Sequence, residues 1–479
     1  MKTFLWLAGW VFILLLLILA ITSYAVNQSW RHLEEYRTAL ENRGEIFDIH
    51  RLSPPAAPEE GNGAKDFLAT GRELQQAAKN ENFQPTQMVG ETSPGGNVVQ
   101  HLAPNASRSQ KEVPWDEVRQ QVTLFEPMLT RIHHAADSPF LEIHSDYSKG
   151  FHMELVGVTE TLKTSQILGL QGLLFLREGN ASGAVRNVSA ILRLTEMIQR
   201  QPVLISQLSA AVQITTAQAL TWEILQSLKT TEQDLSHLQE DWRRVRPPDL
   251  SLDLRMERYS GLLFFESATA ADYTGALTFS AFGSPPHASW PEPFRSWINL
   301  AGFSIWGNLY RHTDARRFLA CYQALIDNVP PNPSNGPWIP FLEKAKSLQS
   351  ELSDSGQEHL FSRAMMPSLE LSFSRIFAAQ AAARLSQTAI ALQQHRLSRG
   401  RYPAALQELT PAWLPEVPSD PFDALPLRYR RLDGDAYLLY SIGPDGKDDG
   451  GDGNNRNGKR PSKFLDAKDL IWPRAAPTP

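Results

Sequence analysis

Residues 368–403 read SLELSFSRIFAAQAAARLSQTAIALQQHRLSRGRYP, and this stretch sets the architecture of the carboxyl-terminal part of the chain. Apolar residues recur in it every three or four positions, as on one face of a helix. The apolar stripe consists of Phe373, Phe377, Ala381, Leu385, Ala389 and Leu392. Alanine-rich runs favour helix formation, and Gly400 followed by Pro403 marks a helix end. We therefore expect one long helix here.

Two strand-like runs follow this helix. In residues 425–432 the apolar side chains of Leu425, Leu427 and Tyr429 alternate with polar ones, and residues 436–441 place Tyr437, Leu439 and Ser441 on one side. A turn, Asp433-Gly434-Asp435, separates the two runs, which predicts a β-hairpin. The run AKDLIWP, residues 467–473, is the expected last strand. Residues 367–479 are thus predicted to form a small α+β domain with an antiparallel sheet.

Helical periodicity dominates the middle of the chain. The runs GNASGAVRNVSAILRLTEMIQ (179–199) and VLISQLSAAVQITTAQALTWEILQSL (203–228) each carry an apolar face at helical spacing. The link REGNASGA, residues 177–184, is typical of a turn between antiparallel helices, although no 34-residue repeat is present. Residues 116–366 are therefore predicted to form a large all-α helical-hairpin domain in a mainly α protein. Residues 27–115 are expected to hold a stalk helix that stops near Gly44, and then an irregular Pro/Gly-rich segment with a short helix at 64–80.

The run FLWLAGWVFILLLLILAITSY, Phe4 to Tyr24, carries no charge and is long enough to cross a bilayer as a helix. Trp6, Trp10 and Tyr24 suit the two membrane interfaces. A cleaved signal peptide is the alternative, because SYA before Val26 offers small residues for cleavage, but its apolar run would be shorter. We expect an uncleaved transmembrane helix in residues 1–26. Such a helix predicts a single-pass protein of the inner (cytoplasmic) membrane. Residues 4–24 would lie in the bilayer, and the bulk of the chain would be extracytoplasmic.

Composition excludes some classes of function. The net charge is −6 over 479 residues and no long basic run occurs, so a nucleic-acid partner is not expected. Cys321 is the one cysteine, which excludes an intramolecular disulfide and any cysteine-based zinc or iron–sulfur centre. It lies in the apparent helix ARRFLACYQALIDN, residues 315–328, where a buried core position is the simplest interpretation.

The stretch SIGPDGKDDGGDGNNRNG, residues 441–458, concentrates acidic residues and glycines. Its carboxylates are Asp445, Asp448, Asp449 and Asp452. A loop of this composition is either solvated or a cation site, since calcium takes six to eight oxygen ligands. Lys447 and Arg456 occupy the third and twelfth positions counted from Asp445, so the loop lacks the spacing of an EF-hand. The residues alone leave both interpretations open.

An ordered series of motifs runs through the last hundred or so residues. It consists of GRYP (400–403), Leu406 and Leu409, the run Pro418-x-Asp420-Pro421-Phe422, PLRY (426–429), YLLYSIGPDG (437–446) and DLIW (469–472). This series resembles the carboxyl-terminal domain of the major pseudopilin of type II secretion. The resemblance implies a calcium ion that orders the end of the sheet, without catalysis. The ligands it implies are Ser441, Asp445, Asp466, Asp469 and the carbonyl of Leu439, with Asp448 and Asp449 as helpers.

The rest of the chain departs from that family. No basic leader or peptidase site precedes the apolar segment, and no acidic residue lies within it. A long helical region also separates it from the carboxyl-terminal helix, so assembly as an ordinary pilus subunit is not expected. The whole chain is similar to uncharacterised bacterial envelope proteins that join an anchor, a stalk, a helical region and a pseudopilin-like end. That group implies no activity.

Three functions remain open from the sequence. The first is a non-catalytic scaffold whose helical domain binds an envelope partner. The second is an accessory role in type II secretion or a pilus-like system, through docking of the carboxyl-terminal domain. The third is a membrane-anchored hydrolase whose site lies among the histidines and acidic residues of the helical region, with His133, His144 and His152 as the candidates. No metalloprotease, nucleophile-elbow, phosphate-loop or dinucleotide motif supports an enzyme. Convergence of those histidines with a carboxylate in one pocket would favour the hydrolase.

Overall fold

The computed structural model describes residues 2–55, 58–81, 115–280, 292–366, 369–433, 435–454 and 467–472 of the chain. Its amino-terminal helices are α1 (Lys2–Asn42), α2 (Ile49–Leu52) and α3 (Ala64–Asn80). The central helices are α6 (Trp115–Ala136), α7 (Val158–Arg177), α8 (Ala181–Gln199), α9 (Leu204–Gln226), α10 (Glu232–Arg244), α11 (Leu250–Ser267), α12 (Ala270–Ser280), α13 (Glu292–Leu309), α14 (Arg311–Ile326), α15 (Ile339–Ser353) and α16 (Leu360–Met365). The carboxyl-terminal elements are α17 (Leu369–Arg399), β1 (Arg428–Leu432), β2 (Ala436–Ser441) and β3 (Leu470–Ile471). Short 3-10 helices are η1 (Tyr147–His152), η2 (Gln357–His359) and η3 (Leu406–Leu409).

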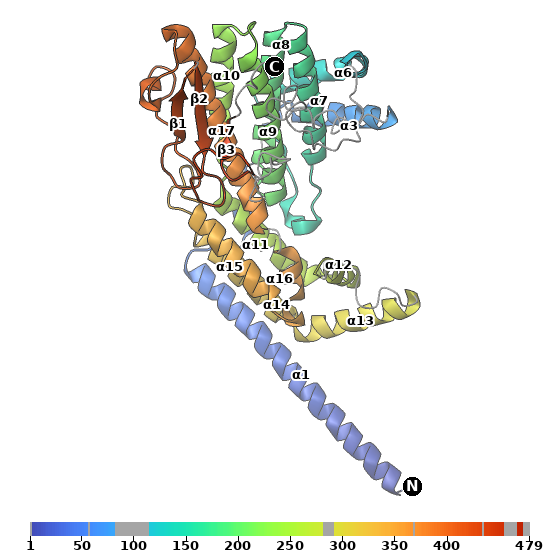
Figure 1. The fold of residues 1–479 in the computed structure, drawn as a ribbon. Coiled ribbons are helices and arrows are strands. Elements are labelled where there is room, and N and C mark those ends of the chain that lie inside the picture. The colour runs from blue at the N-terminus through green and yellow to red at the C-terminus, as the bar shows by residue number, and fades with distance from the viewer. Residues whose placement is uncertain are drawn as a thin grey trace.

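The expected mainly α architecture with a small antiparallel sheet is confirmed. Figure 1 shows the helices gathered in an elongated body, with α1 projecting from one end and the sheet at the other. The short helix expected at 64–80 is α3, with the same bounds. The link at 177–184 is also confirmed, because α7 ends at Arg177 and the Asn180 side chain caps α8 by accepting the Gly183 N–H at 2.9 Å. The expected loops at 82–114 lie outside the described residues.

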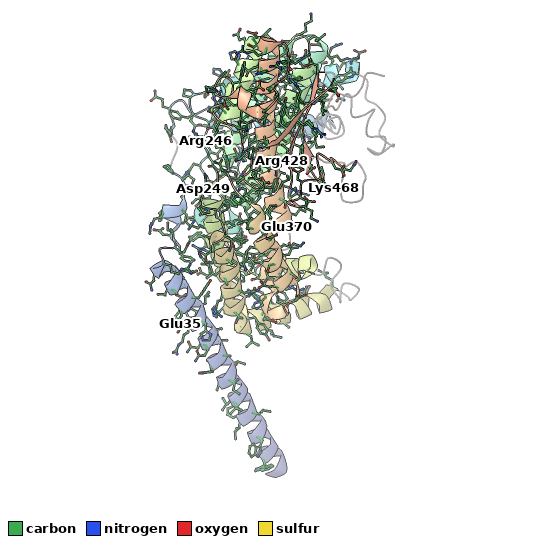
Figure 2. All side chains as sticks on the ribbon, turned by 60° about the vertical axis from the view of Figure 1, so that its left-hand side comes forward. Glu35, Arg246, Asp249, Glu370, Arg428 and Lys468 are labelled. Atoms are coloured by element: carbon green, nitrogen blue, oxygen red, sulfur yellow. The ribbon has the colours of Figure 1, made fainter. Side chains whose placement is uncertain are left out.

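Helix α1 joins the projecting segment to the body without a break. Its second half packs on the body, where Leu33 and Leu40 are buried. The helix ends at Asn42, and Gly44 follows in the left-handed region (φ +91°), as expected for the stop. Figure 2 shows the same projection from another side, with Glu35 near the point where α1 leaves the body.

Among the described residues, no helix combines the length and the apolar character that crossing a membrane requires. Part of the predicted span at 4–24 lies outside the residues whose side chains are described.

Two apolar cores run through the body. We call the first the hairpin core, because it fills the space between α3 and α6–α10; it includes Phe67, Phe125, Ile167, Val188, Ile214 and Trp242. We call the second the junction core, because it joins α11 and α14–α16 to the sheet; it includes Leu204, Leu254, Phe318, Phe341, Phe373 and Phe422. Cys321 is buried in the junction core, and burial raises the pKa of its thiol to about 11.

Helix α17 lies between the two cores and contributes to both. Ala381 and Leu385 belong to the junction core, whereas Ala382 and Ile390 belong to the hairpin core. Its alanines let neighbouring helices approach closely from several sides, and α9, α10, α15, β2 and β3 all contact it. The predicted long helix is confirmed and ends at Arg399, before Gly400 in the left-handed region (φ +73°).

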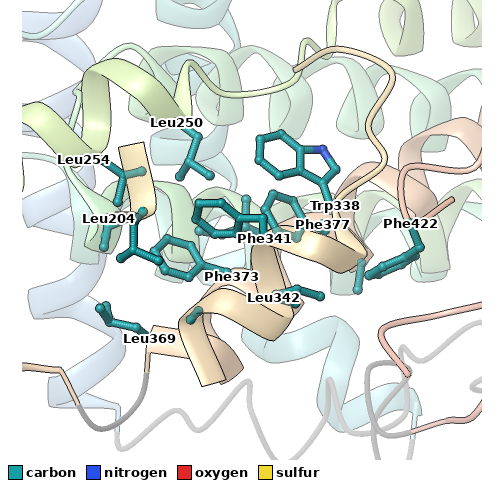
Figure 3. Packing of buried hydrophobic residues seen from close by; sticks show 14 of the residues in the cluster. Leu204, Leu250, Leu254, Trp338, Phe341, Leu342, Leu369, Phe373, Phe377 and Phe422 are labelled. Carbon is teal, nitrogen blue, oxygen red and sulfur yellow. The ribbon is translucent and has the colours of Figure 1, made fainter. Parts of the chain in front are cut away.

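Packing is continuous between the helical region and the carboxyl-terminal part. The indole of Trp338 stacks on Phe377 with ring centroids 4.1 Å apart, and Phe341 lies beside both (Figure 3). The backbone N–H of Trp338 also donates to the carbonyl of Pro421 at 3.1 Å. One apolar core therefore spans residues on both sides of position 366.

The sheet has the order β1-β2-β3 and is antiparallel throughout. Tyr429 lies opposite Leu439, and Tyr440 lies opposite Ile471, so the expected hairpin and last strand are both confirmed. The prediction for Leu425 was wrong: its side chain is 57% exposed, whereas Leu427 is buried. The reason is local, because β1 begins only at Arg428 and Leu425 belongs to the turn before it.

Candidate functional site

The acidic loop begins where β2 ends, at the buried residue Ser441. The Ser441 hydroxyl donates to the Asp420 carboxylate at 2.9 Å and accepts the Gly443 N–H at 3.3 Å. The carbonyl of Leu439 accepts the Trp472 N–H at 2.9 Å, as part of the sheet. Both predicted ligands therefore have partners within the protein.

Asp469 closes the loop from the other side. Its buried carboxylate accepts the N–H groups of Asp449 (3.4 Å), Gly451 (2.7 Å) and Asp452 (3.0 Å). Burial raises the pKa of Asp469, although the three N–H donors favour its ionised form. This carboxylate therefore holds the glycine-rich segment against β3.

The remaining acidic groups of the loop contact donors or cations nearby. Asp448 accepts the Tyr440 hydroxyl at 2.8 Å and pairs with Arg428 at 3.3 Å. The Asp445 carboxylate accepts the Lys447 N–H at 3.1 Å. Asp452 pairs with the Lys468 ammonium at 2.8 Å. These contacts relieve the mutual repulsion that made the acidic run a candidate cation site.

Arg428 and Asp420 organise this end of the sheet, a role that the sequence patterns did not predict. The Arg428 guanidinium pairs with Asp423, with Asp448 and, at 3.4 Å, with Asp420. The hydrogen bonds that Arg428 donates to the Asp423 carboxylate raise the pKa of the guanidinium. Asp420 is fully buried and accepts the Ile442 N–H at 2.8 Å, and burial raises its pKa. The motif at 418–422 was the one signal that could have drawn attention to Asp420.

Several described residues of the predicted calcium site already have partners within the protein. Asp469 directs its oxygens at backbone N–H groups and Asp448 directs its oxygens at Arg428 and Tyr440, so neither presents a free oxygen cluster. Within the described residues, no group of three or more histidine, cysteine or acidic side chains could hold a metal ion. Asp466, the remaining predicted ligand, lies outside the described residues. Calcium binding stays a prediction.

The histidines do not come together. His133 is buried, and its Nε2 is 3.0 Å from Oδ1 of Asn187 in the hairpin core; burial lowers its pKa. His152 stacks on Phe264 with ring centroids 6.2 Å apart. His144 lies exposed in a loop, and Asp146 accepts the Ser148 N–H at 3.2 Å as the cap of η1. The arrangement that would favour a hydrolase is absent from these described residues.

A cavity of about 300 Å³ lies where the helical region meets the carboxyl-terminal part. Its walls come from α9, α17, the link between α10 and α11, and residues 414–419. Figure 2 shows Arg246, a residue of that link, at the edge of the body. The cavity holds polar groups from segments far apart in the chain, above all Gln207 of α9 and Gln380 and Arg384 of α17. Sequence patterns missed it, because no local motif connects those positions.

Comparison of the chain with protein-family models, with curated proteins and with solved structures found no match.

Proposed function

We propose that the chain is a membrane-anchored extracytoplasmic protein that binds a partner through its helical body. The anchor is the first half of α1, and the support for it is the exposure of its apolar side chains. Those described as exposed are Trp6, Trp10, Phe12, Ile13, Leu14, Leu16, Leu17, Ile21 and Tyr24. Each would be stabilised by removal from water, by about 25 cal/mol per Å² of apolar surface.

The described exposed side chains cover more than half of the helix circumference. Successive helical residues are about 100° apart, so Phe12, Ile13, Leu14, Leu16 and Leu17 span an arc of about 200° around the axis. A second helix would cover a single stripe, as in a coiled coil. A lipid bilayer covers every face, so it is the occupant we propose for this segment.

The observation that carries the proposal is the continuity of α1. One helix runs from the exposed apolar half into the half that packs on the body, where Leu33 and Leu40 are buried. Just beyond its end, Glu45 pairs with Arg255 (3.1 Å) and Arg258 (3.0 Å) of α11. The body therefore stands at a fixed position relative to the anchor. We infer that the body is extracytoplasmic and that the protein is single-pass in the inner membrane, the usual orientation of a signal anchor.

A binding role, without catalysis, is supported by the chemistry of the cavity. Its described lining holds amide and guanidinium groups beside apolar ones, and it includes no histidine, cysteine or lysine. Its serines are Ser334 and Ser419, and the Ser419 hydroxyl accepts from the Arg384 guanidinium at 3.2 Å, a partner that cannot act as a general base. The cavity is suited to recognition of a polar ligand.

Membrane fractionation of the full chain tests the anchor. The wild-type chain is expected in the membrane fraction after an alkaline wash, and the double variant Leu14→Arg/Leu17→Arg is expected in the soluble fraction, because a charge at the bilayer centre is costly. Leu228→Arg serves as the control, since Leu228 is fully exposed outside α1. Recovery of wild-type chain in the soluble fraction, or a mature chain beginning at Val26, would contradict the anchor.

A further inference from the structure

The cavity between α9 and α17 offers polar atoms that the protein itself does not satisfy. Gln380 is 94% buried, and neither its Nε2 nor its Oε1 has a hydrogen-bond partner among the described residues. Gln207 is also buried, and its Nε2 donates to the carbonyl of Gln199 at 3.0 Å and to Asp253 at 3.3 Å. Its Oε1 has no partner in the described part of the chain. Both residues line the cavity, so one amide donor and two amide acceptors that no described residue pairs with are buried in its wall.

Such unpaired groups are costly. A buried polar group without a hydrogen bond lowers the free energy of unfolding by about 1–3 kcal/mol, and native proteins retain few of them. A side chain that keeps both amide atoms unpaired beside a cavity is well explained by a ligand that pairs with them. An amide matches another amide, because each offers one N–H donor and one carbonyl acceptor.

Arg384 supplies a positive charge next to Gln380. The two residues lie four positions apart on α17 and so share one face of the helix. The Arg384 guanidinium donates to the carbonyl of Ser419 at 2.6 Å and to the carbonyl of Ser334. These partners are neutral. Burial lowers the pKa of Arg384 to about 10, so it stays charged at neutral pH. The carboxylates of Asp420 and Glu416 act on Arg384 through charge and raise its pKa against the effect of burial, but neither forms an ion pair with it.

The rest of the lining is also more positive than negative. Arg243 and Arg246 also line the cavity, and Glu416, which is exposed, is the acidic residue of the described lining. The apolar part of the wall includes Ile214 and Ile376. A ligand that fits these walls carries a negative charge, a hydrogen-bonding amide and a small apolar portion.

We propose that this cavity binds a short peptide segment that carries a carboxylate. Arg384 faces the carboxylate, Gln380 and Gln207 pair with a main-chain amide, and the isoleucines contact small apolar side chains. A volume of about 300 Å³ lies at the lower end for ligand pockets, which limits the bound segment to roughly two or three residues. The inference deepens the binding role proposed above and rests on it, but it does not depend on the anchor.

Water is the competing occupant. A cavity of this size has room for water molecules, and water can bond to the amides of Gln380 and Gln207. Water does not neutralise the Arg384 guanidinium, whereas a carboxylate does so through charge-assisted hydrogen bonds. A comparison of a charged ligand with an uncharged one therefore distinguishes a bound carboxylate from bound water.

Isothermal titration of the full chain in detergent micelles tests the proposal. The probe is acetyl-Ala-Val-Glu-amide, which carries one carboxylate, and its matched control is acetyl-Ala-Val-Gln-amide, which has the same size and no charge. We expect saturable binding of the acidic peptide and at least about tenfold weaker binding of the neutral one, because one charge-assisted hydrogen bond accounts for about that factor. Equal binding of the two peptides, or no saturable binding of either, would overturn the proposal.

Two variants locate the binding at this cavity. Arg384→Gln is expected to weaken binding of the acidic peptide by about tenfold or more, whereas Arg399→Gln, on the exposed end of the same helix, should leave binding unchanged. Gln380→Leu should weaken binding and at the same time raise the melting temperature, because it removes two unpaired buried atoms. If Gln380→Leu lowers the melting temperature instead, Gln380 has a structural partner and the inference fails. The membrane fractionation is independent of these outcomes, so failure here leaves the anchor standing.

Discussion

Glu45 and Arg258 form an ion pair, 3.0 Å long, that fastens the segment after α1 to α11. The Arg258 side chain is fully buried, and its guanidinium also donates to the carbonyl of Ile46 at 3.1 Å and lies 4.2 Å from the ring centre of Phe47. Burial lowers the pKa of Arg258, and Glu45 opposes that effect. The end of α1 is thereby bound to the body by charge, hydrogen bonds and an aromatic contact.

Glu45→Gln is expected to lower the free energy of unfolding by about 3 kcal/mol, because it leaves the Arg258 guanidinium buried without its counter-charge. Arg258→Met in the same chain should restore part of the loss, since both charges are then gone. Urea unfolding measures both effects. Arg131→Gln, which breaks the exposed pair with Glu73, is the control and should change stability by less than about 1 kcal/mol. A Glu45→Gln effect as small as that of the control would contradict a stabilising role for the pair.

Stability should also depend on the ionisation of Glu257. Burial raises the pKa of this side chain to about 7, and its carboxylate accepts the Leu204 N–H at 2.9 Å. Because the folded pKa lies above the ordinary value of 4.5, the contribution of Glu257 to stability is complete below pH 4.5 and is lost as the pH rises through 7. Glu257→Gln keeps a neutral acceptor for Leu204. The difference in urea midpoint, variant minus wild type, is therefore expected to increase from pH 4.5 to pH 7.5; a difference that does not change with pH would refute the shift.

Gly261 marks a close approach between α11 and α14. A Cβ atom at this position would overlap the ring of Phe318, which is fully buried. Gly261→Ala should therefore destabilise the protein by about 1–3 kcal/mol, the usual cost of overpacking, despite the better helix propensity of alanine. Gly307→Ala in α13 is the matched control, since its nearest neighbour would be the end of Arg311 at 3.4 Å. That variant should be neutral or stabilising by up to about 1 kcal/mol. Thermal melts of both variants test the contrast.

Asp469→Asn should loosen the acidic loop. The wild-type carboxylate accepts three backbone N–H groups, and an asparagine amide would turn its own NH₂ toward some of them. A loss of about 1–3 kcal/mol is expected in protein treated with a chelator, where any metal is absent. Asp449→Asn is the control, because that side chain is exposed. Equal stability of wild type and Asp469→Asn would show that these hydrogen bonds do not hold the loop.

Calcium titration of the same proteins tests the metal prediction separately. Millimolar calcium, but not magnesium, should raise the melting temperature of the wild-type chain by mass action if the loop binds calcium. The increase should vanish in Asp469→Asn. An unchanged melting temperature with calcium would mean that the hydrogen bonds of Asp469 and the ion pairs of Arg428 close the loop without a metal.

The sequence by itself determined the elements whose signals are local. The stripe from Phe373 to Leu392 predicted α17, the turn at 433–435 predicted the hairpin, and Asn180 and Gly400 marked helix ends. These features could be predicted because helix and hairpin hydrogen bonds join residues a few positions apart, so side-chain period and turn chemistry reveal them.

The tertiary structure alone decided which distant groups meet. Asp469, which the resemblance to the pseudopilin domain implied as a metal ligand, accepts backbone N–H groups of the acidic loop, and Arg428 pairs with the carboxylates around it. Gln207 and Gln380 line one cavity from helices far apart in the chain, and α17 divides its faces between two cores. Such contacts depend on how whole helices pack, and packing follows from the complementary shapes of many side chains together, which no short stretch of sequence records.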